Sequence, residues 1–426
     1  MTDTPDSDDA SSTTPRGGAR RARRVPRSVV ESRPAKTNGG RGKRRAPRKH
    51  TVAMVITATL LALAMSTAVS VVLIYNHWNG NLDVIDVSGQ LEDRPDKKDV
   101  EGPQEPVNIL VMGSDTREGA GNNIDGLTGD GERSDTTILL HLSANREFAY
   151  GISIPRDTMV DRPTCYAEDG SEIPGDDDTL WNVAFSVGGP ACTIQQFEQL
   201  TDIRIDNYVV LDFQGFREMV DSLDGVEVCI PEEIYDPEHQ ITLEEGTREV
   251  MGEEALSYVR VRYTVGDGSD PHRIRRQQAF MASMINKAIS AGMLVRPDRM
   301  VSFLNAVTDS LQTDFENIGQ LADIGRSFQG IGLDRIKFVT TPWEPYPADP
   351  NRIQWTTQVG GLWDLVLNDQ PLSEEFAEDS ISAADDVEGS DSPSEPSATD
   401  GGGGNGGGKG DEGLSQDERA AAGLCT

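Results

Sequence analysis

Residues 108–117 read NILVMGSDTR, and this stretch predicts the class of fold. Its first half is a short apolar run typical of a buried strand, and it leads directly into Gly113, Ser114 and Asp115. Open α/β sheets place ligands at the carboxyl ends of their strands. The stretch therefore predicts a strand that carries Asp115 to a binding site. A plain turn capped by Asp115 is the alternative.

The alternation of short strands and longer helices continues from residue 105 to residue 370. The predicted strands are Val107–Met112, Thr136–Leu142, Phe148–Ile154, Tyr208–Leu211, Val226–Ile230 and Ile336–Thr340. The predicted helices lie around Ala191–Leu200, Phe213–Leu223, Gly252–Tyr258, Pro271–Ala291, Arg296–Leu311 and Gly361–Leu367. Such alternation is typical of an α/β fold, so we expect a central mixed β-sheet flanked by helices on both faces.

A second polar cluster, Arg133-Ser134-Asp135, stands just before a predicted strand. The Gly- and Asn-rich loop at 119–131 can fold back and bring Asp115 and Asp135 together. Two neighbouring carboxylates repel each other unless a cation lies between them, and Mg²⁺ prefers oxygen ligands. We therefore expect Mg²⁺ (or Mn²⁺) on Asp115 and Asp135, with an exposed acidic loop as the alternative.

A third cluster, Pro155-Arg156-Asp157-Thr158, again follows a strand. Asp157 is placed to orient Arg156 by a bidentate bond. A plain surface ion pair is the alternative interpretation.

The fourth cluster is the most specific, and it reads YVRVRYTVGDGSDPHRIRRQQ over residues 258–278. Arg260 and Arg262 are two residues apart, so on an extended segment they share one face. Guanidinium groups match phosphate oxygens bidentately, which favours Arg over Lys at such a site. A basic face that offsets acidic neighbours is the alternative.

A helix is expected in the second half of the same cluster. Asp270 fits a helix N-cap and Pro271 the first helical position. Arg273 and Gln277 are then i,i+4 neighbours on one face of that helix.

Familiar hydrolase and nucleotide motifs are absent from the chain. It has no GxSxG, no GxxxxGKS/T and no HExxH, and of its five histidines only His272 falls inside a cluster. The predicted chemistry is therefore electrostatic, with arginines and a metal neutralising phosphate charge.

The segment Thr51–Tyr75 carries no charge and predicts a transmembrane helix. As a helix it spans about 37 Å, longer than a hydrocarbon core of about 30 Å. Six Lys or Arg residues lie between residues 41 and 49, and Asp83 and Asp86 follow. The positive-inside rule then predicts a single-pass signal-anchor in the cell membrane, with a cytoplasmic N-terminus and an extracytoplasmic catalytic domain. A cleaved signal peptide is the alternative.

The remaining divisions follow composition. We expect a disordered basic cytoplasmic segment at 1–50, the span at 51–75, a linker at 76–104, a folded domain at 105–370 and a disordered acidic, Gly-rich tail at 371–426. The formal net charge is −32 although the first fifty residues are basic, so nucleic acid is not expected as a partner of the folded part.

Four cysteines are present, and none lies in a CxxC or a Cys/His cluster, so zinc is not expected. In an extracytoplasmic domain two of Cys165, Cys192 and Cys229 are expected to form a disulfide, in a pairing that spacing leaves open. Cys425, in the tail, is expected to be unpaired.

Taken together and in this order, the clusters resemble the LytR-CpsA-Psr family of cell-wall glycopolymer transferases, actinobacterial type, over residues 105–370. The matching motifs are NILVMGSDTR, RSDT, SIPRDT, WNVAFSVGGP, LDFQGF and YVRVR…RIRRQQ. The resemblance implies a phosphotransferase that moves a glycopolymer from a polyprenyl-pyrophosphate carrier onto peptidoglycan, with prenyl-pyrophosphate hydrolysis as a side activity. It also implies an apolar tunnel for the prenyl tail.

The resemblance also assigns residues to the site. Asp115 and Asp135 match the Mg²⁺-binding aspartates, and these two with Arg133 and Arg156 form the expected catalytic set. The expected pyrophosphate-binding set is Arg117, Arg133, Arg156, Arg260, Arg262, Arg273 and Gln277.

One departure from the family pattern concerns residues 180–182. Leu180-Trp181-Asn182 stands where many members have Lys-Ile-Asn, so one cationic contact is expected to be missing. This leaves a non-catalytic lipid-pyrophosphate binding or scaffold protein of the cell envelope as the alternative function.

Overall fold

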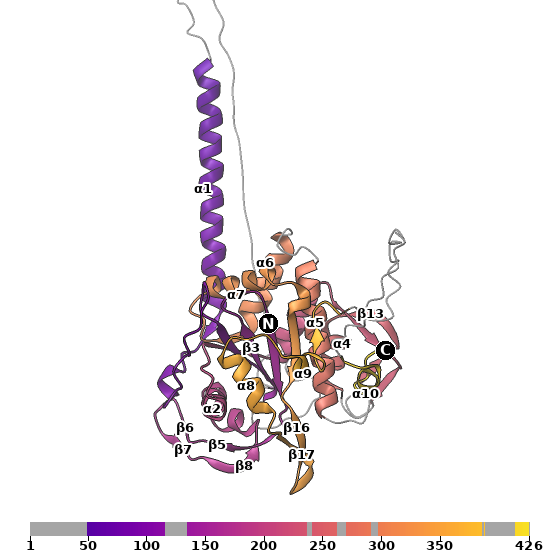
Figure 1. Cartoon of the computed structure of the whole chain (residues 1–426). Helices are drawn as coiled ribbons and strands as arrows, with labels where there is room; N and C mark the ends of the chain where they lie inside the picture. The colour runs from indigo at the N-terminus through magenta and orange to yellow at the C-terminus, as the bar shows by residue number, and fades with distance from the viewer. Residues whose placement is uncertain are drawn as a thin grey trace, which may run out of the picture. The chain divides into compact units, whose positions relative to one another are not determined.

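The computed structural model describes residues 49–115, 134–236, 241–261, 270–290, 297–385, 387 and 414–425. Helix α1, Lys49–Asn81, contains the predicted apolar segment and is long and apolar enough to cross a membrane. The chain divides into a unit that ends at Ala64 and a second unit that runs from Met65 to Thr426. All the strands and the other helices belong to the second unit (Figure 1).

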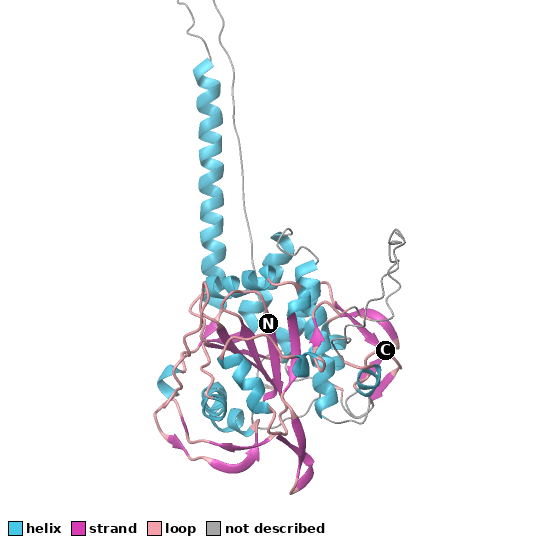
Figure 2. Ribbon diagram, in the orientation of Figure 1, coloured by secondary structure: helices cyan, strands magenta, loops and turns pink. Residues whose placement is uncertain are grey.

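An eight-stranded mixed sheet forms the centre of the second unit, in the order β1-β14-β9-β2-β3-β4-β15-β18 (Figure 2). β2, β3 and β4 run antiparallel in sequence, whereas β9 pairs parallel with β2 and β15 pairs parallel with β4. Its strands are β1 Asp83–Val84, β2 Val107–Ser114, β3 Ser134–Leu142, β4 Ala149–Ile154, β9 Asn207–Leu211, β14 Leu311–Thr313, β15 Ile336–Thr340 and β18 Ile381–Ser382. The predicted central mixed sheet is confirmed.

Helices cover both faces of this sheet, as predicted. Helices α2 (Val183–Thr201) and α8 (Val359–Leu367) share one apolar cluster with β2, β3 and β4. The other face is covered by α3 Phe213–Ser222, α4 Gly252–Arg260, α5 Asp270–Ser290, α6 Pro297–Ser310 and α7 Ile318–Gly330. The helix α7 was not predicted, because its stretch holds three glycines and few large apolar residues.

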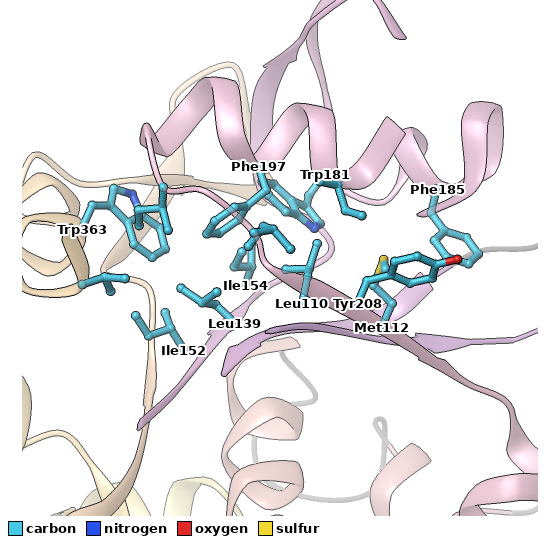
Figure 3. Packing of buried hydrophobic residues seen from close by; sticks show 14 of the residues in the cluster. Leu110, Met112, Leu139, Ile152, Ile154, Trp181, Phe185, Phe197, Tyr208 and Trp363 are labelled. Carbon is cyan, nitrogen blue, oxygen red and sulfur yellow. The ribbon is translucent and has the colours of Figure 1, made fainter. Parts of the chain in front are cut away.

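Side chains alternate between the two faces of the sheet because a strand has a period of two. Leu110 and Met112 of β2 point into the cluster under α2 and α8, whereas Val111 points to the other face. Figure 3 shows how densely the first face is filled, with Trp181, Phe197 and Trp363 packed over the strands. We call this side of the sheet the closed face and the other the open face.

Short two-stranded sheets surround the centre. They are β5–β8 (Met159–Arg162 with Asp176–Leu180), β6–β7 (Cys165–Tyr166 with Glu172–Ile173), β10–β13 (Val226–Ile230 with Gly246–Val250), β11–β12 (Ile234–Asp236 with Ile241–Leu243) and β16–β17 (Trp343–Tyr346 with Asp349–Trp355). The predicted strand at 226–230 exists, but it pairs with β13 and not with the central sheet.

The structure corrects the expected boundary at residue 370. Helix α9 (Glu374–Ala377), strand β18 and helix α10 (Gln416–Ala421) all lie beyond it. Ile381, Ala383 and Leu424 are buried in an apolar cluster with residues of α5 and β15. Residues 371–385 and 414–425 are therefore part of the folded domain, because this burial compensates for a composition that is polar on average.

The expected linker at 76–104 also packs on the domain. β1 extends the central sheet by pairing with β14, and η1 (Ser88–Gln90) follows; a second short 3₁₀ turn, η3, covers Leu333–Arg335. Arg94 Nε donates to Glu198 Oε2 at 2.8 Å, and Lys97 Nζ pairs with Asp206 at 2.7 Å.

All four cysteines are in disulfides. Cys165 pairs with Cys192 at a Cα–Cα distance of 5.2 Å, which confirms that two of the first three cysteines are joined. The expectation for Cys425 is wrong, because it pairs with Cys229 across 196 residues of sequence. The spacing of the cysteines along the chain does not predict this pair, because the pair forms only when the C-terminal segment folds back onto the domain.

Candidate functional site

A cavity of about 130 Å³ lies on the open face, between strands β2, β3 and β9 and helices α3, α4 and α5. Its lining is divided by chemistry. The apolar part is formed by Val111, Ile138, Leu211, Phe213, Phe216, Leu256, Val259, Phe280 and Met281. The polar part is formed by Ser114, Asp135, Thr136, Asp212, Arg260, Arg273 and Gln277.

A β-bulge places Asp135 at this cavity. Gly113 pairs with Thr136 and Ser114 with Ser134, so Asp135 is the extra residue of the bulge. A bulge of this kind bends the strand and re-aims a side chain, and bulges are frequent beside active sites. Asp115 directly follows Ser114, so the two predicted aspartates flank one paired position at the strand ends.

Arg156 follows β4 and forms an ion pair with Asp135 through Nη1. Its own neighbour Asp157 lies 3.7 Å from Nε, too far for the bidentate bond that the sequence suggested. Instead, Asp157 Oδ1 accepts a hydrogen bond from Arg352 Nη1 of β17 at 2.5 Å. Asp135 is therefore a partner of Arg156 that the sequence did not indicate, and Arg352 is a neighbour that sequence reasoning missed.

Helix α5 supplies Arg273 and Gln277 from one face, as the i,i+4 spacing predicted. Arg273 is 4 % exposed, and its Nη2 lies 3.4 Å from the backbone carbonyl oxygen of Asp135. Gln277 Nε2 donates to the carbonyl of Val259 at 3.1 Å, and its Oε1 accepts from Thr136 Oγ1 at 3.3 Å. Gln277 thus joins α5 to both β3 and the end of α4.

Arg260 is the last residue of α4, which corrects the expected extended pair of arginines. The prediction rested on the two-residue spacing of Arg260 and Arg262, which puts both on one face only where the chain is extended. Ala255, Leu256 and Val259 are buried on one side of the helix, and this burial keeps the segment helical up to its C-cap at Val261. The Arg260 guanidinium lies over the Phe213 ring, 4.7 Å from the ring centre.

The structure brings together five of the predicted site residues, namely Asp135, Arg156, Arg260, Arg273 and Gln277. Asp115 directly follows the neighbouring strand β2. Arg117, Arg133 and Arg262 lie outside the described residues. The roles assigned to these residues stay predictions. Within the described ranges no group of three or more His, Cys, Asp or Glu side chains is arranged to hold a metal.

The aromatic walls were not predicted as site residues. Phe213 and Phe216 belong to the LDFQGF motif, and Phe280 follows the RRQQ motif by two residues. In the sequence these aromatic residues belong to a regular spacing of large apolar residues on α3 and α5. The same spacing is typical of ordinary core residues, so it did not identify them as site residues.

The departure at Leu180-Trp181 also has a structural explanation. Trp181 is fully buried in the closed face, and its Nε1 donates to Thr137 Oγ1 at 3.1 Å. Neither Leu180 nor Trp181 is among the residues that line the cavity. The substitution therefore changes packing behind the sheet and not the lining of the described cavity.

Comparison with known sequences places these features in a family. The model of the LytR_cpsA_psr family matches residues 74–370. A probable cell wall biosynthesis protein, LcpB from Corynebacterium glutamicum, is 34% identical over 230 residues, which are 53% of this chain and 52% of that protein. A polyisoprenyl-teichoic acid–peptidoglycan teichoic acid transferase, TagU from Halalkalibacterium halodurans, is 33% identical over 59% of this chain and 80% of its own.

Several of the curated relatives are matched over about half of their length only, LcpB among them. Two solved structures are similar as well. TagT bound to LI-WTA is 22% identical, covering 66% of this chain and 98% of its own with a TM-score of 0.48. A LytR-Csp2A-Psr enzyme from Actinomyces oris is 18% identical, covering 66% and 97% with a TM-score of 0.48.

Proposed function

The chain belongs to the LytR_cpsA_psr family, and on this premise we propose that it is a phosphotransferase of cell-wall assembly. It moves a glycopolymer from a polyprenyl-pyrophosphate carrier onto peptidoglycan. The relative TagU carries a name with the same two partners, a polyisoprenyl-linked polymer and peptidoglycan. Slow hydrolysis of a prenyl pyrophosphate is proposed as a side activity when water replaces the sugar acceptor.

The observation that carries this proposal is the division of the cavity into an apolar and a polar part. The apolar walls, with Phe213, Phe216 and Phe280 among them, suit a prenyl chain. The polar part presents Arg260 and Arg273, and Arg156 stands beside Asp135. Guanidinium groups bind phosphate oxygens bidentately, so the cavity suits an amphiphile with an anionic phosphate head and an apolar tail.

The arginines also suit the chemistry of the transfer. An acceptor hydroxyl forms a bond to the sugar-linked phosphorus, and the bond from that phosphorus to the bridging oxygen breaks. Prenyl monophosphate leaves, and the hydroxyl proton is released. Negative charge builds on the phosphoryl and bridging oxygens during this step, and Arg156, Arg260 and Arg273 are proposed to stabilise it. Arg117, Arg133 and Arg262 are proposed to complete the set.

We propose that Asp115 and Asp135 hold Mg²⁺ or Mn²⁺. Both fit the ion, since they flank one paired position at the strand ends and Mg²⁺ usually takes one or two protein carboxylates plus phosphate oxygens. When bound, the ion supplies further positive charge to the phosphate oxygens. Arg156, which forms an ion pair with Asp135, adds a fixed positive charge at the same place.

The setting proposed for this activity is the outer side of the cell membrane. Helix α1 is long and apolar enough to span it once. The basic residues before the helix favour a cytoplasmic N-terminus, so the folded domain would face the cell wall, where peptidoglycan is found.

Turnover of a prenyl pyrophosphate by the full chain in detergent tests this proposal. Geranylgeranyl pyrophosphate and Mg²⁺ should give geranylgeranyl monophosphate and phosphate. Asp135→Asn should lower the rate by about 100-fold, the size of effect seen when one transition-state contact is removed. Asp177→Asn, on the exposed strand β8, is the matched control and should leave the rate unchanged.

The alternative, a binding or scaffold protein without turnover, gives a different result. It predicts tight binding of the same lipid, no release of phosphate with Mg²⁺ or Mn²⁺, and no difference in rate between the two variants. That outcome would refute the transferase proposal and support the scaffold alternative.

A further inference from the structure

Arg276 lies on α5 between Arg273 and Gln277, yet it does not line the cavity. Its side chain is fully buried, and burial lowers its pKa to about 10. Burying a guanidinium group is costly unless hydrogen bonds compensate for the lost water. Within the described ranges no carboxylate forms an ion pair with Arg276, so its partners explain why it is there.

Those partners are two backbone carbonyl groups at helix ends. Arg276 Nη2 donates to the carbonyl of Val261, and Nη1 donates to the carbonyl of Ala422 at 3.0 Å. Val261 is the C-cap of α4 and Ala422 is the C-cap of α10. Carbonyl groups at the end of a helix carry partial negative charge and stabilise a cation placed there. One side chain of α5 therefore joins the ends of two other helices.

The end of α4 is also part of the polar site. The carbonyl of Val259 accepts from Gln277, and the carbonyl of Val261 accepts from Arg276. Arg260 stands between these two anchored carbonyls, with its guanidinium over the Phe213 ring. Two consecutive side chains of α5 thus hold the backbone on either side of Arg260.

The C-terminal segment 414–425, which contains Ala422, is itself anchored. Ala422 and Leu424 are buried in an apolar cluster that includes Phe338 of β15. Cys425 is bonded to Cys229 of β10, and Arg419 Nε donates to the carbonyl of Cys425 at 2.8 Å. The Ala422 carbonyl is therefore a fixed acceptor for Arg276.

We propose that Arg276 is a positioning residue for the pyrophosphate site and that the disulfide-tethered C-terminal segment is its anchor. The inference rests on the proposed function, because it assumes a pyrophosphate at Arg260 and Arg273. Releasing the segment removes one partner of the buried guanidinium. The end of α4 then loses its fixed position, so the arginine cluster loses phosphate affinity while the apolar walls keep theirs.

Two probes separate these effects in the full chain in detergent: farnesyl pyrophosphate, which has both parts, and farnesol, which has only the apolar part. The decisive quantity is the ratio of their dissociation constants. Cys229→Ser with Cys425→Ser removes the tether and changes no residue that lines the cavity. We expect it to weaken farnesyl pyrophosphate binding about tenfold, a typical coupling between sites, and to leave farnesol binding unchanged.

The matched control is Cys165→Ser with Cys192→Ser, which removes the disulfide beside α2. This variant should lose general stability, but its ratio of the two dissociation constants should equal that of the wild type. Substitutions of Arg276 give an independent test. Arg276→Lys keeps the charge without the two-pronged guanidinium, so its ratio should fall between those of the wild type and Arg276→Met.

The outcomes separate the two proposals. A wild type that binds farnesyl pyrophosphate no more tightly than farnesol refutes the proposed function. A wild type that prefers the pyrophosphate, with the same preference in the Cys229/Cys425 double variant, refutes the positioning role and leaves Arg276 a purely structural residue. If Arg276→Met does not fold, the cysteine pair decides the question.

Discussion

The closed and open faces of the central sheet are built from the same strands and differ in what covers them. On the closed face Leu110 and Leu139 are fully buried beneath Trp181, Phe197 and Trp363 (Figure 3). On the open face Val111 and Ile138 line a cavity of about 130 Å³ with charged groups in its lining. Adjacent residues of one strand therefore have different surroundings, close packing on one side and a partly polar cavity on the other.

The two faces also differ in what they contribute to the stability of the domain. Well-packed aromatic and aliphatic side chains bury a large apolar area on the closed face, and this burial stabilises the fold. The open face is less fully packed and has two arginines and two carboxylates at a cavity, an arrangement that suits a ligand. Mutations on the two faces should accordingly separate loss of stability from loss of binding.

The largest expected effect is on the closed face. Trp181→Ala removes a fully buried side chain that contacts Phe197 and Trp355, so it should lower the free energy of unfolding by about 3–5 kcal/mol. Urea unfolding followed by circular dichroism measures it. Tyr235→Ala, at a site 60% exposed, should cost less than about 1 kcal/mol. Equal losses in the two variants would contradict the closed face as the main core.

Two adjacent residues of β3 compare the faces directly. Leu139→Phe adds volume to the closed face and should cost about 1–3 kcal/mol of stability through overpacking. Ile138→Phe adds its volume toward the cavity, so its cost should be smaller. Calorimetry on farnesyl pyrophosphate should show weaker binding by Ile138→Phe only. If Leu139→Phe weakened binding as much, the cavity would not be the site of the prenyl chain.

On α5 the comparison is between neighbouring arginines. Arg273→Lys replaces a guanidinium of the polar site and should weaken farnesyl pyrophosphate binding about tenfold, or about 1.4 kcal/mol. Arg275→Lys is the control, because Arg275 pairs with Asp379 and does not line the cavity. Titration calorimetry at fixed salt gives both dissociation constants. A pair of equal values would remove Arg273 from the phosphate site.

The smallest expected effect concerns Asp314, beside Tyr208 of the closed face. Burial raises the pKa of Asp314, although Oδ1 accepts hydrogen bonds from Tyr208 N and Asn207 Nδ2 at 3.0 and 3.1 Å. A raised folded-state pKa means that this group contributes stability at low pH and loses it as pH rises through that value. Asp314→Asn keeps the acceptor without the charge.

Asp314→Asn should therefore stabilise the fold at pH 7 by up to about 1 kcal/mol, with the gain shrinking as pH falls toward 3.8, the ordinary value. Unfolding by urea at a series of pH values measures the difference. A gain that grows as pH falls would contradict the direction of the pKa shift.

Much of the fold followed from local pattern. The strands at 107–112, 136–142 and 336–340 and the helix from Pro271 lie where periodicity and capping residues placed them. Arg273 and Gln277 share a face because four residues make about one helical turn. Local spacing failed at Arg260, where the two-residue interval to Arg262 suggested an extended chain and burial of Leu256 and Val259 kept the chain helical.

Local patterns in the sequence predicted the α/β class, the apolar helix and the polar residues at the strand ends. How these parts combine depends on tertiary contacts, which produce the bulge at Asp135, the apolar walls from α3 and α5, and the pairing of Cys229 with Cys425. The physical reason is range. Periodicity and capping act within one or two turns of chain, whereas a cavity and a disulfide across 196 residues depend on which faces the folded chain buries together.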